Sequence, residues 1–160
     1  MEKTITIILS NRQLCEYEGI ATGVFHPVTT YMNKSEYDSV LTEQQLTDGS
    51  IWPIPICLDI SGSQADLLES GMVIELRDKE EILLAEMRVS DIWKIDKQHE
   101  ALNVYGTDDH AHPGVDYLFN QVKSHYIGGE LMIKSLPMHY DFQQYRITPE
   151  ESKNIAKDFF

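Results

Sequence analysis

The chain has 160 residues, enough for one domain with its own hydrophobic core. Its 26 acidic and 13 basic residues give a formal net charge of −13, and a surface of that sign repels nucleic-acid phosphates and anionic lipid headgroups. No apolar run approaches the roughly 20 residues of a membrane span, so the composition favours a cytoplasmic protein without membrane or nucleic-acid partners.

Alternating apolar residues, helix caps and turn residues divide the chain into short elements. In chain order they are a strand at residues 5–9, helices at 10–20 and 34–41, a strand at 51–60, a short helix at 65–68, strands at 72–77, 82–89 and 92–95, helices at 96–105 and 115–121, a strand at 126–134 and a helix at 149–158. The first run is interpreted as a strand, not a signal peptide, because no small-residue cleavage site follows it. This pattern predicts an α+β fold, mainly β.

Three helix starts carry the clearest local signals. Ser10 is followed three residues later by Gln13, and residues 33–36 (Asn-Lys-Ser-Glu) repeat this capping pattern. Residues 148–151 (Thr-Pro-Glu-Glu) combine an N-cap, a proline at the first helical position and a capping-box glutamate. Gly23 lies where the first helix is expected to end.

Prolines and glycines modify three of the predicted strands. The two prolines within residues 51–60 cannot donate ladder hydrogen bonds, so this strand is predicted to be irregular or at a sheet edge. Gly128 and Gly129 interrupt the last strand, which indicates a bulge or a close backbone approach. The polar residues 78–81 between two strands predict a hairpin.

Four sequence blocks resemble the N-terminal part of the sulfate adenylyltransferase (ATP sulfurylase) family, in the order that the family has them. They are LSNRQLCEYEGIATGVFHPVTTYMN (residues 9–33), DGSIWPIPICLDI (48–60), YGTDDHAHPGV (105–115), and YIGGEL with HYDFQQYRITPEE (within 126–151). The resemblance implies a PUA-like domain, a partly open β-barrel with several short helices, over residues 1–160 as a single domain.

In this family, the N-terminal domain precedes a Rossmann-like nucleotidyltransferase domain. That second domain converts ATP and sulfate to adenosine 5′-phosphosulfate and pyrophosphate, so ATP and Mg are expected for the full enzyme and no cofactor for this chain. Its Gln-x-Arg-Asn signature is absent here, because Gln144 and Arg146 are followed by Ile147. The catalytic domain is therefore expected to be absent from this chain, and the chain alone is predicted to be inactive, with no catalytic, cofactor-binding or metal residue assigned.

Two interpretations of the function follow from the resemblance. In the first, the chain has a structural role, packing against the catalytic domain in cis or in trans, with a possible homo-oligomer in the full enzyme and an exposed apolar patch at Phe159-Phe160. In the second, it is a freestanding PUA-like binding or scaffold module. The negative charge then favours a protein partner over RNA.

Several side chains are candidate site residues, each with a competing structural interpretation. Two histidines and two carboxylates in five residues could ligate zinc, or they could form a solvated turn: Asp108, Asp109, His110 and His112. Two guanidinium groups could hold an anion, or they could pair with carboxylates: Arg12 and Arg146.

The other candidates are interpreted as structural. His26 and His139 are expected to be packed loop residues, because each has aromatic or proline neighbours. Trp52 and Trp93 are expected in the core or an interface. Two thiols are too few for a four-ligand metal cluster and are expected to be reduced and partly buried: Cys15 and Cys57.

Overall fold

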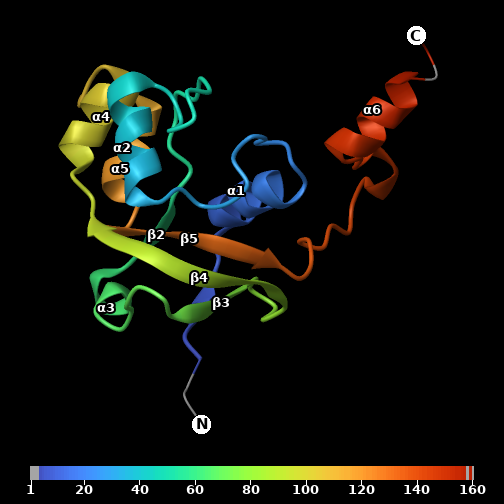
Figure 1. Cartoon of the computed structure of the whole chain (residues 1–160), viewed down its shortest axis with the longest axis horizontal. Helices are drawn as coiled ribbons and strands as arrows, with labels where there is room; N and C mark the ends of the chain where they lie inside the picture. Colours follow the sequence, from blue (N-terminus) through green and yellow to red (C-terminus); the bar gives the residue numbers. More distant parts are fainter. Residues whose placement is uncertain (1–3, 158, 160) are drawn as a thin grey trace. The chain divides into compact units, whose positions relative to one another are not determined.

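The computed structural model describes residues 4–157 and 159, which form one five-stranded sheet and six α-helices (Figure 1). The strands are β1 (Thr6–Ile8), β2 (Leu58–Ile60), β3 (Val73–Arg77), β4 (Leu83–Lys94) and β5 (His125–Ile133). The helices are α1 (Asn11–Ala21), α2 (Lys34–Glu43), α3 (Gly62–Ala65), α4 (Lys97–Tyr105), α5 (Pro113–Asn120) and α6 (Pro149–Lys157), with a 3-10 turn η1 at Gln143–Tyr145. The predictions that fall on Met1–Lys3, Asp158 and Phe160 lie outside the described residues.

The sheet has the strand order β1-β3-β4-β5-β2. Strand β1 runs parallel to β3, with Ile7 opposite Leu76, and β2 runs antiparallel to β5, with Leu58 opposite Ile127. Strands β1 and β2 form the two edges, which confirms the edge position expected for the proline-containing segment. The mixed helices and strands confirm the predicted α+β, PUA-like class.

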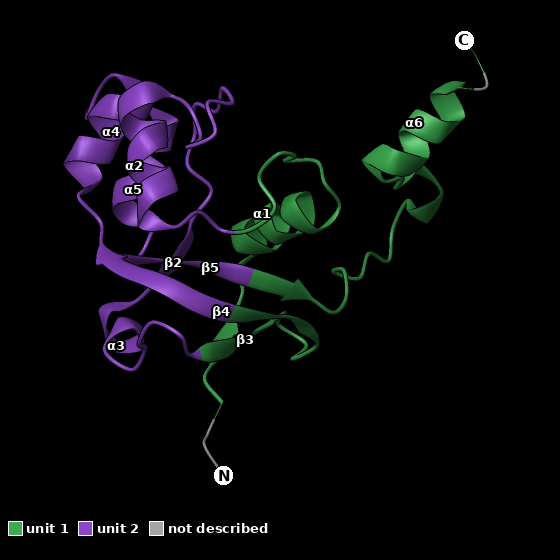
Figure 2. Ribbon diagram, in the orientation of Figure 1, with its two compact units in different colours: residues 1–30, 73–87, 131–160 green, residues 31–72, 88–130 purple. Residues whose placement is uncertain are grey.

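The chain divides into two compact units, shown in green and purple in Figure 2. Unit 1 contains residues 1–30, 73–87 and 131–160, and unit 2 contains residues 31–72 and 88–130. Strands β4 and β5 each contribute residues to both units.

The core of unit 1 forms around Tyr17 of α1. Its side chain is fully buried, and its hydroxyl lies 2.7 Å from the Leu84 carbonyl oxygen and 2.8 Å from that of Ser135. Burial of the phenol raises the pKa of Tyr17 to about 12, because the charged phenolate loses its hydration. One side chain thus joins α1 to β4 and to the segment after β5.

Unit 2 contains the close backbone approach expected at the glycine pair. A Cβ atom added to Gly128 would lie 2.5 Å from Asn33 Cα and 2.5 Å from the Met32 carbonyl oxygen. A side chain at this position would therefore collide with the backbone entering α2. Strand β5 is continuous through both glycines, so the expected interruption of the strand is wrong.

The local capping signals correspond to real helix starts. Ser10 and Gln13 form a reciprocal capping box at α1, and Gly23 follows its end with a φ of 80°. Thr148 Oγ1 accepts a hydrogen bond from the Glu151 backbone N–H, and the Glu151 carboxylate accepts one from the Thr148 N–H at 2.6 Å. At α2 only half of the predicted box forms: Asn33 caps the helix, but the Glu36 carboxylate binds Thr47.

Three element assignments require correction. The short helix predicted at residues 65–68 begins earlier, as α3, because Ser61 and Gln64 form a capping box. No apolar periodicity in the sequence indicates this earlier start. The separate strand predicted at residues 92–95 is wrong, since β4 continues without a break to Lys94. Of residues 51–60, only the last three form a strand, which matches the irregular backbone expected from the prolines.

Candidate functional site

Unit 1 contains a half-open cavity of about 550 Å³. One wall consists of α1 and the loop after it, and the other consists of residues between Leu136 and Pro149. Cys15 and Glu18 of α1 and its C-cap residue Thr22 are spaced three and four residues apart, so they lie on the same side of the helix, toward the cavity. A concavity of this size is large enough to receive a small molecule or a side-chain cluster of another chain.

A glycine shapes the first wall of this cavity. A Cβ atom on Gly19 would lie 2.6 Å from the ring of Phe25, so the ring can rest on α1 only because residue 19 has no side chain. The Phe25 backbone N–H also donates to the Gly19 carbonyl oxygen at 3.1 Å. The loop after α1 is therefore held against its own helix and presents an apolar surface to the cavity.

One hydrogen-bonded pair and one ion pair order the second wall. His139 Nε2 lies 2.7 Å from Glu18 Oε1, and Arg146 Nη2 lies 2.8 Å from Asp141 Oδ1. The hydrogen bond from Arg146 lowers the pKa of the Asp141 carboxyl group. All four side chains keep substantial contact with solvent, so neither pair has the desolvated setting typical of a catalytic acid or base.

The two guanidinium candidates are therefore paired with carboxylates, as the structural interpretation predicts. Arg12 Nε lies 3.0 Å from Glu16 Oε1 one turn along α1, and Arg146 is held by Asp141. The sequence hypothesis that these two groups bind an anion gains no support from their positions.

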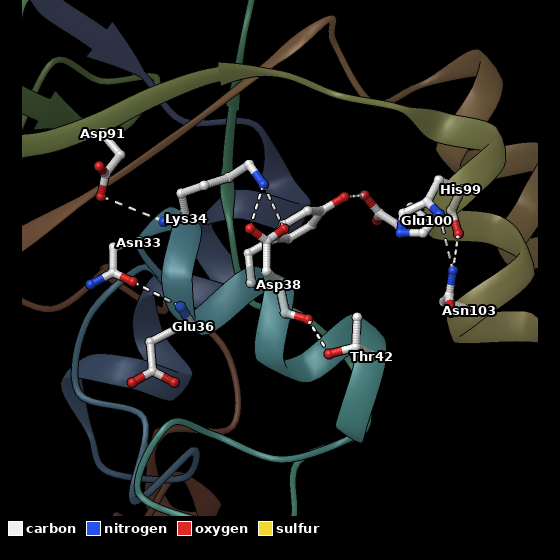
Figure 3. Close-up of polar contacts among 10 residues, drawn as sticks. Asn33, Lys34, Glu36, Asp38, Thr42, Asp91, His99, Glu100 and Asn103 are labelled. Carbon is white, nitrogen blue, oxygen red and sulfur yellow. Dashed lines mark hydrogen bonds and ion pairs between the residues drawn. The ribbon is translucent and has the colours of Figure 1, made fainter.

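Unit 2 contains a buried carboxylate that the sequence does not reveal. Glu100 of α4 is 5% exposed and accepts hydrogen bonds from the hydroxyls of Tyr37 and Tyr126, at 2.8 and 3.1 Å. Figure 3 shows its carboxylate beside α2, which also carries the Lys34–Asp38 ion pair. A glutamate in a helix is ordinarily solvated, and its two partners lie 63 and 26 residues away, so no local signal marks it.

The two tyrosines that donate to this carboxylate belong to a cluster of three aromatic rings. The centroids of Tyr37, Trp93 and Tyr126 lie 5.4 to 5.8 Å apart, in tilted and edge-to-face arrangements. Burial of the hydroxyls, reinforced by the charge of Glu100, raises the pKa of Tyr37 and of Tyr126. The tyrosines therefore act as hydrogen-bond donors to Glu100, and the cluster is a structural network.

The indole nitrogens of Trp52 and Trp93 are buried, but both residues are half-buried as a whole and neither belongs to the buried core. The Trp93 Nε1–H finds no hydrogen-bond acceptor within residues 4–157 and 159. Because the ring lies against Tyr37 and Tyr126, its contribution is packing of the aromatic cluster.

The side chains of the Asp108–His112 turn have separate local roles. Asp108 accepts a hydrogen bond from Gln98 at 2.9 Å, and Asp109 accepts one from the Ala111 N–H at 2.8 Å. His112 Nδ1 accepts from the Gly114 N–H at 3.1 Å as the N-cap of α5, and the ring of His110 packs 4.7 Å from that of Phe119. In the described part of the chain, no three His, Cys, Asp or Glu side chains are grouped so as to hold a metal ion.

The remaining candidates divide between exposed and buried positions. His26 is exposed, so its expected packing is wrong, whereas His139 is half-buried beside Glu18. Cys15 is exposed and Cys57 is buried, and both are thiols as expected, although neither has the predicted intermediate burial. Over the residues described, no helix combines the length and the apolarity needed to cross a bilayer.

The model of the PUA-like domain family matches residues 1–136. Proteins named sulfate adenylyltransferase are similar over nearly the whole chain: 40% identity to that of Mycosarcoma maydis and 36% to that of Nostoc punctiforme, covering 91% and 94% of this chain. The chain spans 26% and 38% of the length of these two relatives and matches their N-terminal part. A solved structure, the hexameric APS kinase from Thiobacillus denitrificans, superposes with a TM-score of 0.75 at 28% identity, over 98% of this chain and 26% of its own.

Proposed function

This chain belongs to the PUA-like domain family, and we propose that it is the non-catalytic N-terminal domain of a sulfate adenylyltransferase. The observation that carries the proposal is the unequal coverage of the alignments. Similarity extends over 91–94% of this chain but over only 26–38% of relatives that bear that name. The conversion of ATP and sulfate to adenosine 5′-phosphosulfate and pyrophosphate then belongs to the part of the polypeptide outside this match.

The chemistry of the described residues supports a non-catalytic role. Transfer at an α-phosphate needs cationic groups and helix N-termini that neutralise the developing charge. Here the two candidate arginines are held by carboxylates, and the formal charge of the whole chain is −13. ATP and Mg would therefore bind to the catalytic domain, and this chain would act in the cytoplasm by supporting that domain.

An activity assay with two proteins tests this proposal. The first is the 160-residue chain alone, for which we expect no sulfate-dependent release of pyrophosphate from ATP and Mg. The second is a chimaera in which this chain replaces the matching 31% of the Schizosaccharomyces pombe relative, and here we expect activity. Activity of the chain alone would refute the non-catalytic assignment, and a folded but inactive chimaera would refute the assignment to this enzyme.

A freestanding binding module is the second candidate, and the cavity of about 550 Å³ in unit 1 is the observation that favours it. The acidic composition makes a structured RNA an unsuitable ligand, because RNA binding depends on basic side chains that neutralise the backbone phosphates. We expect no RNA binding at low salt in a fluorescence-anisotropy titration. Micromolar affinity would instead favour the binding module.

A further inference from the structure

The half-open cavity of unit 1 is preformed, because hydrogen bonds join its two walls. His139 Nε2 of the second wall lies 2.7 Å from Glu18 Oε1 of the first. The Tyr17 hydroxyl of α1 donates to the carbonyl oxygen of Ser135, directly before the second wall begins at Leu136. The volume of about 550 Å³ is therefore present without a ligand and does not have to be opened by one.

Each wall is also held by hydrogen bonds of its own. In the first wall, the Phe25 N–H donates to the Gly19 carbonyl oxygen at 3.1 Å, and the Val28 N–H donates to the Phe25 carbonyl oxygen at 2.7 Å. In the segment of the second wall, Gln143 Nε2 donates to the His139 carbonyl oxygen at 2.9 Å. A ligand that enters a cavity with ordered walls binds more tightly, because less conformational entropy is lost on binding.

Apolar and aromatic side chains form a large part of the lining. Val24 and Phe25 contribute from the first wall, and Leu136, Tyr145 and Ile147 contribute from the second. Val24 and Ile147 are 61% and 51% exposed, so a ligand can remove apolar area from water when it binds. Each wall also supplies one aromatic ring, and aromatic rings pack well against planar ligands. The lining therefore favours a ligand with an aromatic ring system.

The acidic and basic side chains of the lining already have partners. Glu18 is hydrogen-bonded to His139, and Arg146 Nη2 lies 2.8 Å from Asp141 Oδ1. A charged ligand would lose part of its hydration in the cavity and would meet groups whose charge is already balanced. An anion would in addition be repelled by the net charge of −13, and a cation would have to displace the partner of a carboxylate. The cavity therefore favours an uncharged ligand.

Two side chains of the second wall can donate hydrogen bonds to such a ligand. Arg146 uses Nε and Nη2 for Asp141, so within the described residues the Nη1 donors of its guanidinium group remain for a ligand. Thr148 Oγ1 accepts from the Glu151 N–H, and its own O–H can still donate. A carbonyl or amide oxygen on the ligand could accept from either group without separating Arg146 from Asp141.

We propose that this cavity is a binding site for an uncharged aromatic compound that carries a carbonyl or amide oxygen. The ring system covers apolar side chains of the two walls, and the oxygen accepts a hydrogen bond from the second wall. The cavity of about 550 Å³ lies within the range of about 300–1,000 Å³ that is typical of small-molecule sites. The inference goes beyond the proposed function and does not depend on it, because a domain with a structural role can also hold a ligand.

A series of three probes with one ring system tests the ligand class. The probes are indole-3-carboxamide, which is uncharged, indole-3-carboxylate, which is anionic, and indol-3-ylmethylammonium, which is cationic. Each is titrated with the complete 160-residue chain, and ligand-detected NMR measures the affinity. The rate at which iodoacetamide alkylates Cys15 gives a second readout, because this exposed thiol lines the cavity and a bound ligand would shield it. The buried thiol of Cys57 serves as the internal reference.

A variant that fills the cavity tests the location of the site. Val24 lines the cavity and Ile51 does not, and both are exposed aliphatic side chains. Val24→Trp would occupy part of the volume, whereas the control Ile51→Trp adds the same ring at a position outside the cavity. Because both positions are exposed, we expect the two variants to fold like the unchanged chain, as circular dichroism and thermal unfolding would verify.

We expect indole-3-carboxamide to bind the unchanged chain with a Kd below about 1 mM, a value ordinary for a ligand of this size, and to slow the alkylation of Cys15. Binding should be at least about fivefold weaker for Val24→Trp and for the two charged probes, and should change less than about twofold in Ile51→Trp. No saturable binding, equal or tighter binding of a charged probe, or unchanged affinity in a folded Val24→Trp would overturn the proposal. The activity of the chimaera judges the proposed function separately, since that assay contains no aromatic ligand.

Discussion

Removal of the buried carboxylate of Glu100 should be among the most disruptive single changes to the fold. In Glu100→Ala, the hydroxyls of Tyr37 and Tyr126 lose the acceptor that lies 2.8 and 3.1 Å away. A buried donor without a partner costs about 1–3 kcal/mol, so two of them cost about 2–6 kcal/mol. Relief of the desolvation of the carboxylate offsets part of this, and we expect the free energy of unfolding to fall by about 2–4 kcal/mol.

Urea denaturation followed by tryptophan fluorescence measures this loss at the cluster itself. The ring of Trp93 lies 5.4 Å from that of Tyr37, and the Trp52→Phe background removes the other tryptophan signal. A domain of this size has a typical stability of about 5–15 kcal/mol, so the expected change is well within the measurable range. As the control, Glu43→Ala, an exposed residue of α2, should change the stability by less than about 0.5 kcal/mol.

A second set of variants separates the lost hydrogen bonds from lost packing. If unpaired hydroxyls cause the damage, Tyr37→Phe and Tyr126→Phe should each destabilise the unchanged protein but recover stability in the Glu100→Ala background. The triple variant should therefore be more stable than Glu100→Ala alone. A loss below about 1 kcal/mol in Glu100→Ala, or purely additive effects in the cycle, would refute the buried-network reasoning.

Three further predictions concern caps, close packing and thiols. Thr148→Ala should destabilise α6 by about 1 kcal/mol, which faster amide exchange in the helix would show. Hydrogen bonds to Thr148 lower the pKa of Glu151, so the stability that this carboxylate adds to α6 is present above the unfolded pKa and is lost as the pH falls through the lower folded pKa. An acid titration of helicity would detect that loss. Gly128→Ala should destabilise the fold by about 1–3 kcal/mol or more in urea unfolding, because its Cβ would collide with the backbone, and an unchanged midpoint would contradict this. In the native protein, a thiol reagent should modify Cys15 rapidly and Cys57 only after unfolding, and equal rates would show that Cys57 is accessible.

The features that could be predicted from the sequence are those whose causes lie within a few residues. The capping boxes at Ser10 and Thr148 each depend on a partner three positions away, and both form. The close approach at Gly128 could be predicted although the backbone of Met32 and Asn33 is distant in the sequence, because a glycine destabilises a strand unless another segment occupies the space left by the missing side chain. The PUA-like class follows from four blocks in order rather than from the periodicity of any single element.

The features that escaped prediction depend on contacts between distant residues. Glu100 becomes buried because Tyr37 and Tyr126 approach it from other elements, and its own helix gives no sign of that. The polar pair Ser90 and Asp91 suggests a break between two strands, yet β4 runs straight through it. The Asp108–His112 turn resembles a site by composition, but its ligand-type side chains are distributed among separate local hydrogen bonds.

The contacts of Tyr17 also constrain the order of events during protein synthesis. Its hydroxyl donates a hydrogen bond to the carbonyl of Ser135, which is synthesised 118 residues later. Strand β1 likewise cannot form its hydrogen bonds until its partner β3 has been synthesised. At about 5–20 residues per second, α1 therefore spends about 6–24 seconds without the final partner of its central tyrosine. During that interval the buried face of α1 lacks part of the surface that covers it in the folded protein.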